Sequence, residues 1–359
     1  MWSVAGFKKR LLLNMNKTLL VGIVAMAGLG LSINAWSKTK PFTPYPYHGE
    51  PLVEEAVLAF RHASAAAGPT NRLRVAFYNI EMFFDGIRDG KHRDEAVARN
   101  QARGAGELID EIGADILLIA EIENERALGY LNEALENPYP KGYIVQFGTG
   151  GSRREKMNIA LLTRYRPESV HEIDFGPLTG EGRPTRGIFR AVFDLGDGHA
   201  LLVYASHLKS NWGKKMRNYS QRYHAMHLLR DDAARMVAAQ PERQWEMVLL
   251  SDVNTDPLLP EFADDPTLRV LSDWHDLWLE HPDSATIITV PTRYGDPAKE
   301  FPPALFDRVL VNPGLREAPW TVSLPGLIPH GVETGNVQVL PGHGAHISDH
   351  YPVFIDIER

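Results

Sequence analysis

Short apolar runs, separated by turns and charged helical stretches, constrain the fold of this chain most strongly. Their length and their content of Val, Ile, Leu and Phe are typical of buried strands. They occur at residues 73–78, 115–120, 142–147, 158–163, 188–193, 201–205, 245–250, 305–311 and 353–357. Helices are expected over residues 93–112, 125–135 and 218–239. The alternation predicts an α/β fold in which two sheets pack face to face and are flanked by helices.

Composition favours one large globular domain. The 359 residues are 44% hydrophobic and 23% charged, which suits a chain with a large core rather than a disordered or fibrous one. Residues 72–359 show no linker break and are expected to form this domain. Residues 38–71, with several prolines and aromatics, are expected to be a lead-in segment with a short helix within 53–67.

The N-terminus has the pattern of an export signal. Four Lys or Arg residues flank or precede an uncharged, mostly apolar stretch at residues 18–33, and residues 35–37 offer a small–any–small cleavage site. Residues 1–37 are therefore predicted to be a signal peptide, which makes the protein periplasmic or secreted. An uncleaved membrane anchor is the alternative, because the apolar stretch is near the lower limit for a span.

Charge and cysteine content narrow the function classes. Residues 1–37 hold four positive charges and no negative ones, so their removal takes the formal net charge from −7 to −11. Such an acidic body argues against sequence-independent coating of nucleic acid, but not against an enzyme that engages one phosphate. The chain has no cysteine, which excludes disulfides, thiolate chemistry and a lipid-modified cysteine.

Acidic and amide residues stand at or just beyond the ends of several apolar runs. They are Asn79, Glu121, Asp252, Asn254, Asp307 and Asp349, the last followed directly by His350. A folded sheet can deliver such ends to one edge, and the residue types suit a metal site that cleaves phosphoesters. Mg²⁺ prefers oxygen ligands and keeps several waters, so Glu121 with Asn79 beside it fits as a ligand set.

Asp252 and Asn254 are two residues apart, so in an extended segment their side chains point the same way. The carboxylate would then orient or deprotonate an attacking water, while the amide donates to a phosphate oxygen. An Asx turn at the end of the strand is the plainer interpretation, and both can hold at once.

Six strings carry a family resemblance. They are RVAFYNIEMFFD (74–85), DILLIAEIEN (115–124), ASHLKS (205–210), LLSDVNTDP (249–257), FDRVLV (306–311) and SDHYPV (348–353). In this order they resemble the signature blocks of the endonuclease/exonuclease/phosphatase superfamily, over roughly residues 72–359. The resemblance implies a four-layered α/β sandwich and a divalent metal, with Mg²⁺ expected and Mn²⁺ or Ca²⁺ as alternatives.

The resemblance also implies how the last acidic block would act. Asp349 would lie near the metal or its waters, and His350 would meet the phosphate. Asp307 would hold His350, because a carboxylate partner fixes the orientation of an imidazole and raises its proton affinity.

Two cationic or titratable side chains complete the implied site. His207 would contact the scissile phosphate or protonate the leaving oxygen. Arg186 would fork onto two phosphate oxygens, with Arg183 and Arg190 as close competitors.

Three further patterns have plainer interpretations. His343, His346 and His350 resemble zinc-ligand spacing, but flanking glycines favour a loop around one functional histidine. Residues 148–151 are glycine-rich yet lack the lysine of a phosphate loop, so a surface loop is expected. Four cations surround Trp212 just after His207, and these are Lys209, Lys214, Lys215 and Arg217. A solvated face is the usual explanation for them, and guidance of a polyanion is the alternative.

Together these features predict an exported, magnesium-dependent phosphodiesterase whose leading substrate is nucleic acid. A sphingomyelinase-like lipid phosphodiesterase or a phosphomonoesterase is the alternative, and an inactive binding module is the third hypothesis. A nucleic-acid substrate and transient membrane contact are the expected partners, and no obligate protein partner is evident.

Overall fold

The structure of the chain is a computed structural model that describes residues 42–62, 65–66, 68, 71–90, 92–147, 156–284, 286–294, 302–335 and 338–359. The predicted signal peptide at 1–37 and the predicted glycine-rich loop at 148–151 lie outside these ranges. Within them, no helix combines the length and the apolar character that crossing a membrane requires.

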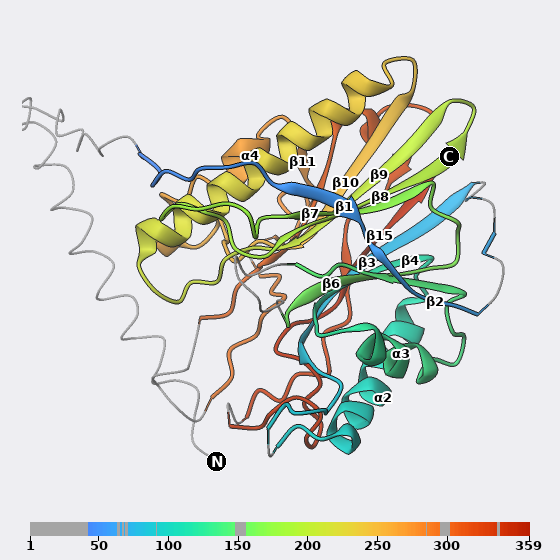
Figure 1. Cartoon of the computed structure of the whole chain (residues 1–359), viewed down its shortest axis with the longest axis vertical. Coiled ribbons are helices and arrows are strands. Elements are labelled where there is room, and N and C mark those ends of the chain that lie inside the picture. The colour runs from blue at the N-terminus through green and yellow to red at the C-terminus, as the bar shows by residue number, and fades with distance from the viewer. Residues whose placement is uncertain are drawn as a thin grey trace, which may run out of the picture. The chain divides into compact units, whose positions relative to one another are not determined.

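Two mixed β-sheets carry the fold (Figure 1). The seven-stranded sheet has the order β1 (Leu52–Glu55), β7 (Ser169–Asp174), β8 (Gly187–Gly196), β9 (His199–His207), β10 (Gln244–Asp252), β12 (Asp307–Val311), β11 (His275–Asp276). The eight-stranded sheet has the order β13 (Thr321–Val322), β15 (Val353–Glu358), β3 (Arg72–Phe83), β4 (Ile116–Ile122), β6 (Asn158–Thr163), β5 (Lys141–Ile144), β2 (Val57–Arg61), and β14 (Gly326–Leu327) pairs with β15.

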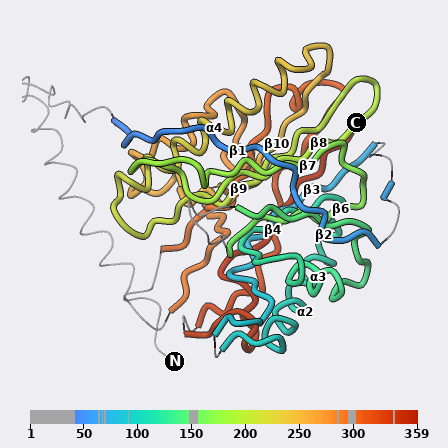
Figure 2. Tube along the Cα trace, in the orientation of Figure 1, coloured from blue at the N-terminus to red at the C-terminus, as the bar shows by residue number. Residues whose placement is uncertain are grey.

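Helices cover the outer face of each sheet. α2 (Glu95–Ile112) and α3 (Glu125–Glu133) lie against the eight-stranded sheet, and α4 (Lys215–Ala239) lies along the seven-stranded one (Figures 1 and 2). Short 3₁₀ turns occupy Pro260–Phe262, Leu268–Leu271 and Pro313–Arg316. The order helix, sheet, sheet, helix is the four-layered sandwich predicted from the sequence.

Side-chain alternation along the strands builds three apolar layers. On β3, Phe77 packs between the two sheets, whereas Tyr78 packs under α2 and α3. On β10, Leu250 lies between the sheets and Leu249 lies under α4. Because both faces of these strands are covered, their sequences are apolar at nearly every position, which is why they stand out as continuous runs.

Local signals fix where the helices begin and end. At the start of α2, the side chain of Asp94 accepts a hydrogen bond from the backbone N–H of Val97 at 3.0 Å. At its end, Gly113 takes a left-handed conformation with φ of 62°, which glycine adopts without steric cost. Asn124 caps α3 in the same manner as Asp94 caps α2.

The helix predicted within residues 53–67 is wrong. β1 pairs with β7 in one sheet and β2 pairs with β5 in the other, so the segment supplies a strand to each. These strands lie at sheet edges and are largely exposed, so they lack the apolar continuity of the central strands. β7 was also missed: it lies between β1 and β8 and is mostly buried, but its polar residues interrupt the apolar run.

Candidate active site

Two parallel strand pairs bring the predicted residues together. β3 and β4 are parallel neighbours joined through α2, and β9 and β10 are parallel neighbours joined through α4. Parallel strands end at the same edge of a sheet, so their terminal side chains lie close together. Asn79 pairs with Ala120, one residue before Glu121, and His207 pairs with Asp252. We call the place where these strand ends meet the mouth.

Two antiparallel strands begin at the mouth. β12 starts with Asp307, which pairs with Asp252. β15 runs antiparallel to β3, and His350 lies three residues before its first residue. The acidic blocks that the sequence placed at strand starts and at strand ends therefore arrive at one site.

Asn79 joins the two sheets at the mouth. Its side-chain Nδ2 donates to Glu121 Oε1 at 3.2 Å and to Asp252 Oδ2 at 3.1 Å. Its Oδ1 accepts from the backbone N–H of Glu81 at 3.1 Å, and the residue is almost completely buried. One side-chain amide thus bridges a carboxylate of one sheet and a carboxylate of the other.

Glu121 is held by unusual backbone geometry. Its φ of 65° is left-handed, and the pairing of β4 with β6 shifts register on either side of it. Its Oε2 accepts from the backbone N–H of Met82 at 2.9 Å, and Glu81 and Met82 are themselves left-handed, with φ of 48° and 47°. Such conformations are costly for residues other than glycine and cluster at functional sites. Burial, followed by the charge of Asp349, raises the pKa of Glu121.

His207 lies between two carboxylates. Its Nε2 is 3.4 Å from both Glu121 Oε1 and Asp252 Oδ2, and its Nδ1 is buried without a partner. Burial, followed by the charges of Arg186 and His350, lowers the pKa of His207 well below its ordinary value. A neutral imidazole favours phosphate contact over proton donation, which are the two roles expected for this residue.

His350 has the opposite electrostatic setting. Its Nδ1 is 2.8 Å from Asp307 Oδ2, and its Nε2 is 3.8 Å from Asp252 Oδ2 and from Asp349 Oδ1. Burial opposes a charged ring here, but the charges of Asp307 and Asp252 outweigh it, so the pKa of His350 is raised well above its ordinary value. This setting favours the protonated ring, in which Nδ1–H donates to Asp307. Trp278 Nε1 donates to the backbone oxygen of Asp307 at 2.9 Å and steadies this pair.

Asn254 departs from the extended geometry expected for it. Its φ is 52°, and its backbone N–H donates to Asp252 Oδ1 at 3.0 Å, so Asp252 closes an Asx turn. The side chain of Asn254 donates to the backbone oxygen of Leu208 at 3.2 Å. Of the two interpretations of this segment, the Asx turn is confirmed and the extended geometry is not, because the turn reverses the chain directly after Asp252. The turn engages Oδ1 of Asp252 and leaves Oδ2 for the mouth.

Of the three competing arginines, Arg186 lies at the site. Its Nη1 donates to the backbone oxygens of His207 and Leu208 at 3.3 and 3.2 Å. Arg190 is instead buried in an ion pair with Asp232, away from the strand ends. Arg183 donates to a backbone oxygen in its own loop.

Comparison with known proteins identifies the family. The model of the Endonuclease/Exonuclease/phosphatase family matches residues 76–350, which is more than half of the chain. The chain belongs to this family. No curated protein sequence matches it.

Solved structures of the endonuclease/exonuclease/phosphatase family share the fold. A family protein from Beutenbergia cavernae DSM 12333 is 16% identical, with a TM-score of 0.55 over 80% of this chain and 72% of that one. TDP2 from D. rerio, solved with a single-strand DNA product, is 16% identical, with a TM-score of 0.52 over 80% and 99%. The mannosyl-6-phosphatase Bt3783 from Bacteroides thetaiotaomicron VPI-5482 is 14% identical, with a TM-score of 0.52 over 80% and 100%.

Enzymes of this family generally use divalent metals. The carboxylate and amide oxygens at the mouth are of the type that such an ion binds. Among the residues that the structure describes, neither Glu121 nor Asp252 forms an ion pair with a lysine or arginine. Buried carboxylates without a lysine or arginine partner are costly in a low dielectric, and hard oxygen donors are the ligands that Mg²⁺ takes. Glu121, Asn79 and Asp349 are the candidate ligands.

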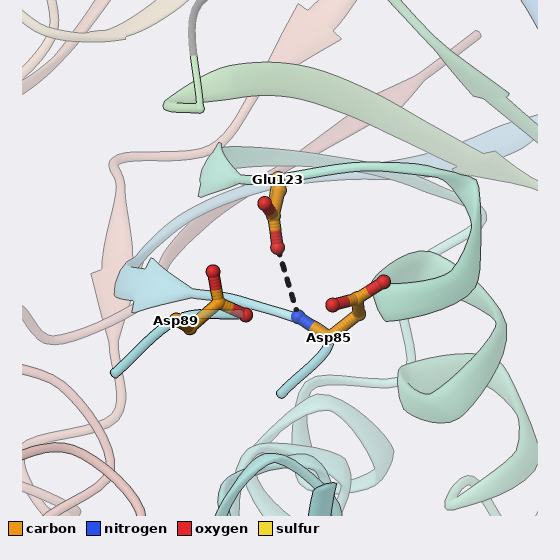
Figure 3. Close-up of side chains that lie close together, drawn as sticks. All are labelled: Asp85, Asp89 and Glu123. Atoms are coloured by element: carbon orange, nitrogen blue, oxygen red, sulfur yellow. Dashed lines mark hydrogen bonds between the residues drawn. The ribbon is translucent and has the colours of Figure 1, made fainter. Parts of the chain in front are cut away.

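A second acidic cluster lies two residues beyond Glu121. Carboxylate oxygens of Asp85, Asp89 and Glu123 lie within 4.8 Å of one another, and Figure 3 shows the backbone N–H of Asp85 donating to Glu123. Lys156 already supplies a cation, since its Nζ is 2.6 Å from both Asp89 Oδ1 and Glu123 Oε1. We interpret this cluster as an ion-pair network; the sequence had given no indication of it.

The histidines that resembled zinc ligands do not converge. His346 Nε2 is 2.8 Å from Glu81 Oε2, whereas the ring of His343 meets the backbone oxygen of His92 at 3.0 Å. His346 and Glu81 are instead supports of the strand bulge at the mouth, and Arg293 Nη1 lies 3.8 Å from Glu81 Oε1. Sequence reasoning missed this support, although Glu81 lies within the first signature string.

Proposed function

We propose that the protein is an exported, magnesium-dependent phosphodiesterase that acts on nucleic acid as a nuclease. The observation that carries the proposal is the convergence of two carboxylates, an amide and two histidines at one mouth. The residues concerned are Asn79, Glu121, His207, Asp252 and His350. The similarity in fold to a TDP2 solved with a DNA product is consistent with nucleic acid, and the equal similarity to a mannosyl-6-phosphatase makes a phosphomonoester the alternative.

Asp252 is the candidate base. Burial raises its pKa, and the charges of Asp307 and Glu121 add to this against the opposing charge of His350. A carboxylate of raised pKa takes a proton from water more readily than an ordinary one does. Its Oδ2 faces the mouth, so we assign it the attacking water.

The remaining residues bind the phosphate. Protonated His350 and the guanidinium of Arg186 meet its negative oxygens, the N–H of neutral His207 donates to another, and Asn254 supplies a further amide. A divalent cation, when bound by Glu121, Asn79 and Asp349, offsets negative charge that grows on the phosphoryl oxygens. Positioned donors of this kind act most strongly in a site that excludes water.

A substrate panel tests this function. Purified protein is assayed for plasmid nicking, sphingomyelin hydrolysis and phosphomonoester hydrolysis, each with Mg²⁺, with Mn²⁺, with Ca²⁺ and with chelator. We expect metal-dependent nicking that is lost in Asp252→Ala. Turnover of sphingomyelin alone, or of the monoester alone, would replace the nuclease proposal with that activity. Binding without turnover of any ester would leave an inactive scaffold.

Export rests on the pattern of residues 1–37 and is tested separately. The full chain and a chain lacking these residues are expressed with a C-terminal tag, and cell fractions are probed for the tag. We expect the full chain in the periplasm or the medium at a mass reduced by the signal peptide. An unprocessed full-length band in the membrane fraction would instead support the anchor.

A further inference from the structure

The segment that follows β9, together with the first residues of α4, forms an exposed, cationic surface beside the mouth. We call residues 209–217 the Trp212 loop; it begins two residues after His207. Its residues 211–217 are all exposed, and the Trp212 side chain is among them at 66%. An exposed indole offers a flat aromatic face with a polar N–H, a combination that is enriched at interfaces.

Side chains of α4 hold the backbone of the Trp212 loop in place. Arg222 of α4, which is completely buried, donates to the backbone oxygen of Lys209 at 2.8 Å and to Asn211 Oδ1 at 3.0 Å. Asn218 Nδ2 donates to the backbone oxygen of Trp212 at 3.1 Å. Because the backbone is fixed in this way, the indole is presented without the entropy cost of ordering a loose segment on binding.

The loop is also continuous with the catalytic turn. Asn211 Nδ2 donates to the backbone oxygen of Asn254 at 3.1 Å, and Asn254 Nδ2 donates to that of Leu208 at 3.2 Å. A chain that places its scissile phosphate at Asp252 would therefore pass next to the loop.

The loop is positive on an acidic protein. Residues 209–217 contain four Lys or Arg and no Asp or Glu, whereas the whole chain has a formal net charge of −7. Within the described ranges, none of Lys214, Lys215 and Arg217 forms an ion pair with a carboxylate. Burial is the main cause that lowers the pKa of Lys209 to about 8, and the charges of Arg186, Arg222 and Arg217 add to it.

We propose that the Trp212 loop binds an unpaired stretch of nucleic acid that flanks the scissile phosphate. The indole stacks on a base, and Lys214, Lys215 and Arg217 contact phosphates on the same side. An unpaired base exposes its face to an aromatic ring, whereas duplex bases are covered by their neighbours. The inference rests on the nuclease proposal and narrows its substrate to single strands, overhangs or frayed ends.

Four variants test the loop: Trp212→Ala, Trp212→Phe, the double variant Lys214→Gln/Lys215→Gln, and the distant double variant Arg61→Gln/Arg103→Gln as a control for lost charge. KM is measured on a single-stranded oligonucleotide, a blunt duplex and bis(p-nitrophenyl) phosphate. Trp212→Ala is expected to raise KM for the single strand about fivefold to a hundredfold and to leave the small diester unchanged. Trp212→Phe should recover most of the loss.

The lysine variants give a second readout. Each phosphate contact contributes about 0.7 to the slope of log affinity against log salt for single strands, so the loop double variant should flatten that slope by about 1.4. The control variant should keep the wild-type slope. Oligonucleotide binding is also followed by fluorescence anisotropy in EDTA, so the loop is tested even where wild-type protein cleaves no nucleic acid.

Three outcomes overturn the inference. Equal KM changes on the oligonucleotide and the small diester would make Trp212 a structural residue. Unchanged oligonucleotide binding in EDTA would remove the loop from recognition, whatever the enzyme cleaves. If the variants instead weaken binding only to vesicles of phosphatidylserine and phosphatidylcholine, the loop is a membrane contact.

Discussion

Each sheet contains the same four-strand arrangement, and the two copies differ in how they position the site. The first half is β15–β3–β4–β6 with α2 between β3 and β4, and the second half is β8–β9–β10–β12 with α4 between β9 and β10. In both, the middle pair is parallel and the outer strands are antiparallel to it. Both middle pairs end at the mouth.

In the second half, the parallel pair β9–β10 keeps its pairing to the last residue at the mouth. Ser206 pairs with Ser251 and His207 with Asp252, with no shift of register. The first half is bulged, because its pairing shifts between Asn79 and Phe83 on β3 and around Glu121 on β4. The backbone ladder therefore places the catalytic groups of the second half, whereas those of the first half need support from outside the sheet.

That support comes from buried polar side chains around the bulge. Gln101 of α2 donates from Nε2 to the backbone oxygens of Ile80, Glu81 and Ile347 at 2.7, 3.0 and 2.9 Å. Ser348 Oγ donates to the backbone oxygen of Asn79 at 2.6 Å. Substitutions away from the mouth should therefore disturb the first half more readily than the second.

The largest expected effect tests whether Asp252 of the second half serves catalysis while Glu121 of the first half binds the metal. Asp252→Asn should lower kcat about a hundredfold to ten-thousandfold by removing the base, with little change in the Mg²⁺ concentration for half-maximal rate. Glu121→Gln should raise that Mg²⁺ concentration, because it removes a negatively charged ligand. Steady-state assays over a Mg²⁺ titration measure both. The division of roles fails if Asp252→Asn shifts the metal midpoint as far as Glu121→Gln does.

The next effect concerns stability of the second half, where a buried ion pair fastens α4 to the sheet. Arg190 Nη1 lies 2.7 and 2.9 Å from the two oxygens of Asp232, and Tyr204 donates to Asp232 Oδ2 at 2.7 Å. Asp232→Asn leaves a buried guanidinium uncompensated and should cost about 3–5 kcal/mol in the free energy of unfolding. Urea titration measures it, and Arg190→Met/Asp232→Leu should recover much of the loss. A cost below about 1 kcal/mol in the single variant would show that the pair does not fasten α4.

A smaller effect is expected from a substitution that removes support from the bulge of the first half. Glu333 N–H donates to His346 Nδ1 at 3.2 Å, so His346 Nε2 carries the proton that it shares with Glu81. His346→Leu removes this support beside Met82, whose N–H holds Glu121, and should weaken Mg²⁺ binding about tenfold to a hundredfold. Calorimetric titration with Mg²⁺ measures the affinity directly.

His343→Leu is the matched control, because its ring contacts the backbone oxygen of His92 rather than Glu81. Equal Mg²⁺ affinities for the His346 and His343 variants would show that the bulge needs no support from His346. Recovery of kcat at saturating Mg²⁺ in the His346 variant would distinguish lost positioning from lost folding.

The sequence predicted the central strands and helices because each carries a strong local pattern. β4 is apolar at nearly every position, and Asp94 and Gly113 bound α2. The sequence did not predict β1 and β2. Both strands are partly polar, and whether they form depends on pairing with the edge of a sheet.

The site was predictable to the same degree. Residues that end apolar strands, such as Asp252, can be recognised in the sequence, and the structure brings the predicted set together. The positive φ of Glu121 and Asn254, and the approach of His346 to Glu81, arise from tertiary contacts between distant segments and leave no local pattern. For this reason the sequence left the extended segment and the Asx turn at Asn254 as alternatives, and the structure shows the turn.

The smallest effect lies at the end of the first half that is remote from the mouth. Arg74 of β3 donates to both oxygens of Asp356 of β15 at 2.8 Å, and this hydrogen bonding lowers the pKa of Asp356 below its ordinary 3.8. A carboxylate with a lowered folded pKa stabilises the protein above its unfolded value and loses that contribution as pH falls through the folded one. Asp356→Asn should therefore cost about 0.2–1 kcal/mol in the free energy of unfolding at pH 7, and the difference from wild type should vanish as the solution is acidified below pH 3.8.

Urea titrations at several pH values test this, and Mg²⁺ affinity should stay at the wild-type value, since the Arg74–Asp356 pair does not touch the bulge. A change in Mg²⁺ affinity comparable to that of His346→Leu would mean that the whole first half, and not the bulge alone, governs the position of Glu121.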